Sequence, residues 1–169
     1  MRYFRASAMV LLLTFVLSLA TVSAQDNILR ILFNQDMRTS DPHIAYETET
    51  WPTASLFYVG LVKLADPGTP VPALAESWTI SDDGTVYTFK LRPDLKFSNG
   101  SPLTAEEVKW SFLRVLSPET ASPTSFMFEP IVGAADFLAG TADDVSGIKV
   151  IDPLTIEFTT GAPVWTMMQ

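Results

Sequence analysis

The chain has 169 residues, with 19 acidic and 11 basic side chains and a formal net charge of −8 at pH 7. An acidic chain of this kind is a poor partner for nucleic acid or for an anionic membrane surface. Because 47% of its residues are hydrophobic, the composition favours a packed core over disorder. The sequence contains no cysteine, which excludes disulfides and a cysteine nucleophile.

Residues 1–24 have the pattern of a secretory signal peptide. Arg2 and Arg5 precede an apolar run at 8–20, and small residues follow at 21–24. The run is shorter than the roughly 20 residues that span a bilayer, so we expect cleavage after Ala24 and no membrane anchor. Without a cysteine at the cleavage site no lipid can be attached there. We therefore expect a soluble periplasmic protein that is not a lipoprotein.

The next stretch contains three weaker elements. An apolar run at residues 28–33 predicts a strand. Pro52 suits the start of a helix, which we expect to run to about residues 58–60. A strand at 61–64 is expected to end in a loop at 66–70, where proline and glycine gather.

Residues 78–92 have the pattern of an antiparallel hairpin. Turn residues at 82–85 separate two runs in which apolar and polar side chains alternate. Pro93 ends the second run, and a short extended piece at 96–97 leads into a turn at 98–100. The hairpin is predicted to have one apolar face, formed by Trp78, Ile80, Tyr87, Phe89 and Leu91.

A helix is predicted to begin at Thr104 and to stop before Pro118. Thr104 and Glu107 have the spacing of a capping box, in which each side chain accepts a backbone N–H of the first turn. Apolar residues at helical spacing predict a buried face formed by Val108, Phe112 and Val115, widened by Trp110, Leu113 and Leu116. We expect four aromatic residues in the core, namely Trp78, Phe89, Phe97 and Trp110.

The remaining residues predict two short helical pieces and a second hairpin. The helical pieces are expected at 126–128 and 134–138. The hairpin is expected to pair 147–151 with 154–159 around Asp152 and Pro153. One face of its second strand contains Leu154, Ile156 and Phe158.

No arrangement of polar residues indicates catalysis or a metal site. His43 is the single histidine and follows Asp41 and Pro42, so we interpret it as a loop histidine or a hydrogen-bonded turn residue. The acidic pairs at 82–83 and 143–144 lack the alternating spacing of a calcium loop and lie where turns are expected. Adjacent carboxylates at 106–107 favour the positive end of a helix. The sequence therefore predicts no catalytic residue, no metal and no cofactor.

Residues 72–114, PALAESWTISDDGTVYTFKLRPDLKFSNGSPLTAEEVKWSFLR, resemble the extracellular solute-binding protein family 5. This family contains the dipeptide and oligopeptide receptors of ABC importers. Further family motifs are similar to SDPH at 40–43, LFYVGLV at 56–62, SPETASP at 117–123 and GIKVID at 147–152. The resemblance extends from about residue 28 to the end of the chain.

The resemblance implies an α/β fold of the periplasmic-binding-protein type II kind, in part. It assigns residues 25–169 to the N-terminal part of the family domain, with 28–44 as the first strand of the main lobe and 45–169 as its small α+β subdomain. Because family members are several times longer, we expect the chain to be an N-terminal fragment. Binding in this family proceeds by closure of two lobes around the ligand.

The resemblance also implies a function and a set of site residues. It predicts the substrate-binding component of an ABC transporter for peptide uptake, without catalysis, whose partners are a peptide and a permease and ATPase complex in the inner membrane. The complete receptor is expected to be a monomer. By position, Tyr46 and Thr48 contact the ligand, and Thr124 stands where the oligopeptide-binding branch has a tyrosine. The alternatives are a receptor for a nickel chelate or an oligosaccharide on the same fold and, from another class, a secreted hydrolase.

Overall fold

The computed structural model describes residues 38–47, 50–66 and 68–164, which belong to the second of two units, 34–169. The predicted signal peptide and the predicted strand at 28–33 lie outside the described residues, and so does Thr48. Within the ranges above, no helix has the length and apolar character needed to cross a membrane.

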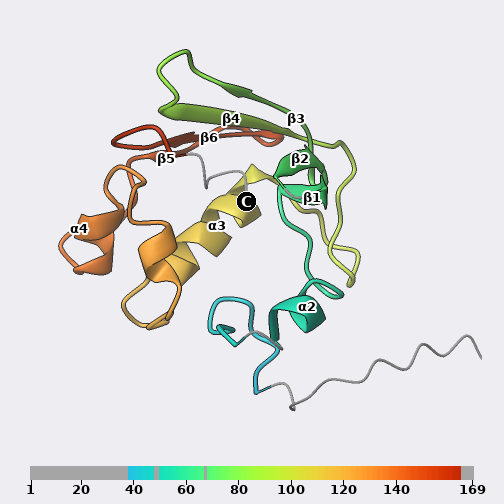
Figure 1. Cartoon of the computed structure of the whole chain (residues 1–169), viewed down its shortest axis with the longest axis horizontal. Coiled ribbons are helices and arrows are strands. Elements are labelled where there is room, and N and C mark those ends of the chain that lie inside the picture. The colour runs from blue at the N-terminus through green and yellow to red at the C-terminus, as the bar shows by residue number, and fades with distance from the viewer. Residues whose placement is uncertain (1–37, 48–49, 67, 165–169) are drawn as a thin grey trace, which may run out of the picture. The chain divides into compact units, whose positions relative to one another are not determined.

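The larger sheet has four antiparallel strands in the order β3-β4-β6-β5 (Figure 1). Its strands are β3 (Ala75–Ile80), β4 (Val86–Leu91), β5 (Ile148–Asp152) and β6 (Thr155–Thr159). Each outer strand pairs with its sequence neighbour, which confirms both predicted hairpins. The hairpins join through their inner strands, where Phe89 lies opposite Ile156. Gly84 has a φ of 71° in the turn between β3 and β4, a left-handed conformation that favours glycine.

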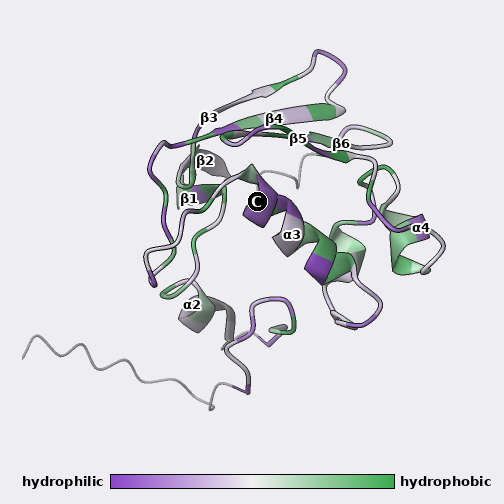
Figure 2. Ribbon diagram, turned by 180° about the vertical axis from the view of Figure 1, so that it is seen from behind, coloured by the Kyte–Doolittle hydropathy of each residue, from purple (hydrophilic) through white to green (hydrophobic). Residues whose placement is uncertain are grey.

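Helix α3 (Ala105–Leu116) packs along this sheet and contacts β5 and β6 (Figure 1). Its predicted capping box is present: Glu107 Oε2 accepts the Thr104 N–H at 2.7 Å, and Thr104 Oγ1 accepts the Glu106 N–H at 3.3 Å. The Phe112 ring packs against Phe158, with the ring centroids 4.6 Å apart. Figure 2 shows hydrophilic residues in the first turns of α3. The helix ends at Leu116, as the sequence predicts.

Two short elements on the C-terminal side of α3 also confirm the sequence prediction. A 3₁₀ helix, η1 (Ser125–Met127), follows α3, and α4 (Ala134–Leu138) follows η1. Phe128, directly after η1, meets Phe112 edge to face with the centroids 5.4 Å apart. This contact fixes the segment after Pro123 on α3.

The N-terminal elements differ from the prediction. Helix α2 (Thr50–Ala54) ends before residues 58–60, because Leu56 and Phe57 are 59% and 67% exposed and no core contact sustains further turns. Strands β1 (Val62–Asp66) and β2 (Thr69–Pro72) form a two-stranded hairpin. The predicted loop at 66–70 is therefore too long, since its last two residues pair in β2.

The aromatic core prediction is correct for Phe89 and Trp78 and wrong for two residues. Phe89 is buried, and Trp78 is half-buried against the core. Trp110 is 62% exposed, because it lies two residues after buried Val108 and hence about 200° around the helix. Phe97 is 43% exposed and follows Lys96, which forms an isolated bridge with Pro102 outside the sheet. Ile80 is 45% exposed at the end of edge strand β3.

Candidate functional site

Residues 38–47, named here the Asp41 loop, form a tight turn with local hydrogen bonds. The backbone N–H groups of Ile44 and Ala45 donate to the Asp41 carbonyl at 3.2 and 3.0 Å. The His43 N–H donates to Asp41 Oδ1 at 3.0 Å, the pattern of an Asx turn. Ala45 is buried and Tyr46, next to it, is 60% exposed. The turn thus directs one side chain inward and the next to solvent.

Arg114, in the last turn of α3, holds the Asp41 carboxylate with both arms of its guanidinium. Arg114 Nη1 donates to Asp41 Oδ1 at 2.7 Å, and Nη2 donates to Oδ2 at 2.5 Å. Such bidentate, charge-assisted pairs are the strongest class of side-chain hydrogen bond. The hydrogen bonds from Arg114 lower the pKa of Asp41 from 3.8 to about 2, with a further contribution from the His43 N–H.

His43 is held in its neutral form between two residues of α3. Its Nδ1 contacts Arg114 Nη1, and its Nε2 lies 3.0 Å from Ser111 Oγ. Because a guanidinium can only donate, Nδ1 is the acceptor and Nε2 carries the proton that is donated to Ser111. Burial lowers the pKa of His43, and the positive charge of Arg114 lowers it further. The interpretation of His43 as a hydrogen-bonded turn residue is confirmed.

Ser122 links the Asp41 loop to the segment that contains Thr124. Ser122 Oγ donates to the His43 carbonyl at 2.5 Å and lies 3.0 Å from Thr124 Oγ1. The hydrogen bond to the His43 carbonyl uses the single hydroxyl proton of Ser122, so the Thr124 hydroxyl donates to Ser122 Oγ. Two segments that are almost 80 positions apart in the chain are thus joined by consecutive hydrogen bonds.

The predicted site residues differ in their surroundings. Tyr46 projects from the Asp41 loop with most of its surface exposed. Thr124 is 4% exposed, and its hydroxyl is engaged by Ser122. The structure brings these two segments together at Ser122, while Thr48 lies outside the described residues. The assignment of all three residues to a ligand site stays a prediction.

An open hollow of about 470 Å³ lies beside the Asp41–Arg114 pair and is lined in part by Pro42, Tyr58 and Trp110. Tyr58 OH donates to the Ser40 carbonyl at 2.9 Å. The Arg114 guanidinium lies 6.0 Å from the centroid of the Trp110 ring, within the range of a cation–π contact. The exposed Trp110 ring therefore covers one side of the ion pair.

Three residues that hold the Asp41 loop were missed by the sequence analysis: Ser111, Arg114 and Ser122. A signal existed for two of them, since Ser111 and Arg114 are three positions apart and so share one face of α3. From the sequence alone, however, Arg114 in the last helical turn is explained equally well by its favourable interaction with the helix dipole. Its contact with Asp41 was therefore not predicted. The sequence does not indicate that Ser122 lies near His43.

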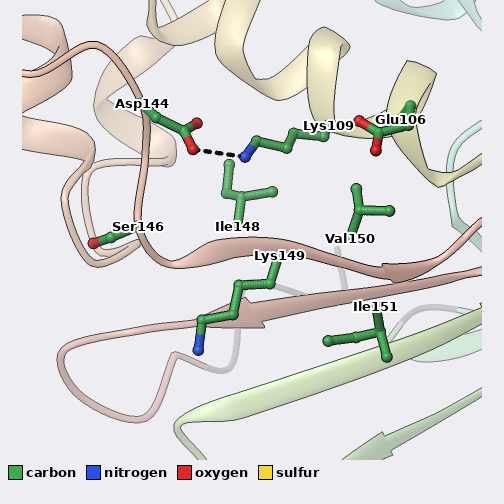
Figure 3. A pocket seen from close by; sticks show the side chains of 8 residues that line it. All are labelled: Glu106, Lys109, Asp144, Ser146, Ile148, Lys149, Val150 and Ile151. Atoms are coloured by element: carbon green, nitrogen blue, oxygen red, sulfur yellow. Dashed lines mark hydrogen bonds and ion pairs between the residues drawn. The ribbon is translucent and has the colours of Figure 1, made fainter.

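A second open hollow, of about 420 Å³, lies between α3 and β5 (Figure 3). Lys109 Nζ and Asp144 Oδ2 form an ion pair across it at 2.7 Å, and Glu106 and Ser146 lie at its margins. Among the residues that the structure describes, no group of three or more histidine or acidic side chains could hold a metal ion. This hollow contains a structural ion pair and no arrangement that suggests chemistry.

The chain has clear counterparts among known proteins. A family model described as bacterial extracellular solute-binding proteins, family 5 Middle, matches residues 69–169. The chain is 33% identical over 133 residues to the dipeptide-binding protein DppE of Bacillus subtilis. The matched region covers 77% of this chain and 24% of that protein. It is 37% identical over 147 residues to YgiS of Escherichia coli, a probable deoxycholate-binding periplasmic protein, covering 85% and 28% respectively.

Solved structures give the same answer for the fold. The substrate-binding domain of an oligopeptide ABC transporter from Bacillus anthracis superimposes with a TM-score of 0.75 at 34% identity, covering 80% of this chain and 26% of that one. The architecture is thus part of an α/β periplasmic-binding-protein type II fold, as predicted. The chain belongs to the bacterial extracellular solute-binding proteins, family 5. It spans about a quarter of the length of the relatives that it matches.

Proposed function

We propose that the whole protein is the substrate-binding component of an ABC importer for peptides, and that the Asp41 loop contributes to its ligand site. The observation that carries the proposal is the placement of Tyr46, which is 60% exposed on a loop held to the rigid helix α3. Loops fixed by a rigid scaffold are common places for binding residues. The similarity to a dipeptide-binding protein supports a peptide ligand.

The proposed ligand-contacting residues are Tyr46, Thr48 and Thr124. An exposed tyrosine offers a large contact surface with a polar end, which suits binding to peptides of many sequences. Thr124 presents only a small surface, because it is almost fully buried under the loop. A tyrosine at this position would add a ring contact that this chain lacks.

The remaining assignments follow from the same proposal. Residues 1–24 direct export and are removed without lipid attachment, and the receptor works in the periplasm as a monomer. Residues 45–169 form the small subdomain of the first lobe, and 28–44 begin the main lobe. A permease and ATPase complex in the inner membrane takes up the released peptide. The protein performs no catalysis and needs no cofactor.

A second candidate ligand is an apolar carboxylated molecule of the bile-acid class. It is favoured by the similarity to the probable deoxycholate-binding protein, which extends over 85% of this chain. Three exposed apolar side chains near the two linked segments agree with such a ligand: Tyr46, Phe126 and Met127. A peptide would instead be bound mainly through hydrogen bonds to its backbone.

The two candidates are separated by titration calorimetry on a receptor of full family length that carries residues 38–164 of this chain. Such a receptor can be built by exchanging the matching segment of the Bacillus subtilis relative. A mixed tripeptide library and deoxycholate are titrated in parallel. If only the tripeptides give saturable heat, the peptide ligand is supported. If only deoxycholate does, the bile-acid ligand is supported and the peptide ligand is wrong. If neither gives saturable heat, both proposals are wrong.

A further inference from the structure

We infer that Arg114 is a positioning residue: by holding Asp41 and His43 together on α3, it sets the place of the Asp41 loop and so the affinity of the ligand site. The inference rests on the proposed function of this loop. It concerns a residue that need not touch the ligand, because Arg114 acts through the turn that precedes Tyr46.

The local hydrogen bonds of the Asp41 loop define its shape and not its position. The bonds from Ile44 and Ala45 to the Asp41 carbonyl close the turn on itself. The bond from the His43 N–H to the Asp41 carboxylate is also internal to the loop. None of these contacts attaches the turn to another element, and a turn of a few residues that is held only by its own hydrogen bonds opens readily in water. The position must therefore come from residues elsewhere in the chain.

Arg114 supplies the largest share of those longer-range contacts at the turn. It donates twice to Asp41 and once to His43, which are the first and last residues of the Asp-Pro-His triplet. Ser111, one helical turn earlier, meets the other nitrogen of His43. One helix thus fixes both ends of the triplet, and the Ser122 hydroxyl donates to the backbone carbonyl of His43.

The helix itself is a firm base for this contact. Val108, Val115 and Leu116 are buried against the sheet, and the capping box fixes the first turn. Arg114 directly precedes the buried residues Val115 and Leu116, so its backbone cannot shift without disturbing the core. A displacement of the Asp41 loop would therefore break the contacts with Arg114 and leave α3 in place.

The contact needs an arginine and not simply a positive charge. Asp41 accepts from two separate nitrogens, and His43 Nδ1 accepts from one of the same pair. A planar guanidinium can serve these three acceptors at once, whereas a lysine ammonium is a single point. We therefore expect Arg114→Lys to recover only part of what Arg114→Met loses.

The chain offers a matched control on the same helix. Lys109 forms an ion pair with Asp144 at 2.7 Å, away from the Asp41 loop. Lys109→Met removes a cation and an ion pair from α3, as Arg114→Met does, without touching the triplet. We expect both variants to lower the melting temperature, so a change specific to the loop separates positioning from general stability.

The first readout is amide hydrogen exchange of the unliganded chain, which needs no ligand. With Arg114→Met we expect exchange at Ile44 and Ala45 to accelerate about tenfold or more, while β4 and β6 change little. Lys109→Met should leave both loop amides unchanged, and Arg114→Lys should give an intermediate rate. Equal acceleration in the loop and in the sheet, or no acceleration in the loop, would overturn the inference.

The second readout is the affinity of the full-length receptor for the mixed tripeptide library. Arg114→Met should weaken binding about tenfold, and adding Tyr46→Ala should weaken it little further, because both changes remove the same contact. If Tyr46→Ala weakens binding and Arg114→Met does not, the positioning role is wrong and the proposed function stands. If the unmodified receptor binds no tripeptide, the proposed function fails, and hydrogen exchange alone decides whether Arg114 positions the loop.

Discussion

Replacing Asp41 by asparagine tests the ion pair that holds the Asp41 loop. The folded chain lowers the pKa of this carboxyl from 3.8 to about 2. At about 1.4 kcal/mol per pKa unit, this shift corresponds to at most about 2.5 kcal/mol. The Asp41 side chain is 25% exposed, so solvent and salt screen part of the interaction, and we expect Asp41→Asn to cost about 1 to 2 kcal/mol at pH 7.

The pH dependence of this cost has a definite sign. A carboxyl whose pKa is lowered by folding stabilises the protein above pH 3.8, and this stability is lost as the pH falls from 3.8 towards about 2. The difference between the wild-type chain and Asp41→Asn should therefore shrink to roughly half at pH 3. Contributions from other titrating groups cancel in the difference between the two proteins.

The assay is urea unfolding followed by tryptophan fluorescence at pH 7, pH 5 and pH 3 at low salt. Asp82→Asn serves as the control, because Asp82 is an exposed turn carboxylate and its replacement should change stability by no more than about 0.5 kcal/mol. A cost of Asp41→Asn that is the same at pH 3 and pH 7, or no cost at any pH, would refute the assignment of the lowered pKa to the Arg114 pair.

Three further predictions concern the histidine, the core and the N-terminus. Burial and Arg114 lower the pKa of His43 from 6.5, so the unfolded chain takes up the proton at a higher pH than the folded chain does. Stability should therefore fall as the pH drops below 6.5. His43→Gln should flatten a plot of melting temperature against pH between pH 5 and pH 7, and an unchanged slope would refute this prediction. Phe89→Ala should lower the free energy of unfolding in urea by about 3 to 5 kcal/mol, since Phe89 is 1% exposed. Trp110→Ala should lower it far less, because Trp110 is 62% exposed. Equal losses for the two variants would contradict the packing of these side chains. N-terminal sequencing and mass spectrometry of exported protein should find Gln25 first with no acyl group, and a retained apolar run at residues 8–20 would contradict the signal peptide.

The elements with local causes were predictable from the sequence. Both hairpins and α3 follow from alternation, turn residues and a capping box, all of which act within a few positions. Trp110 was misplaced because its helix is apolar around much of its circumference, and the pattern alone did not decide which side meets the sheet. Helix α2 is shorter than predicted, and Leu56 and Phe57, which follow it, are mostly exposed and do not belong to the core.

The candidate site was only half predictable. Its loop and Tyr46 are indicated by the family motif, but the residues that hold the loop are 68 to 79 positions away along the chain. Pairing across such separations depends on how the helix packs on the sheet, which no local pattern encodes. The bidentate Arg114 pair and the Ser122 link therefore emerge only from the tertiary structure.

The most direct test compares two aromatic residues in the full-length receptor, using tripeptide affinity and the melting temperature of the unliganded protein. Tyr46→Ala should weaken tripeptide binding by about 1 to 3 kcal/mol and leave the melting temperature nearly unchanged, because the side chain is exposed without ligand. Trp78→Ala should lower the melting temperature and leave affinity intact, since Trp78 packs against the core. If Tyr46→Ala instead lowers the melting temperature as much as Trp78→Ala and binds tripeptides as tightly as the wild type, then Tyr46 belongs to the core and the Asp41 loop is not part of the ligand site.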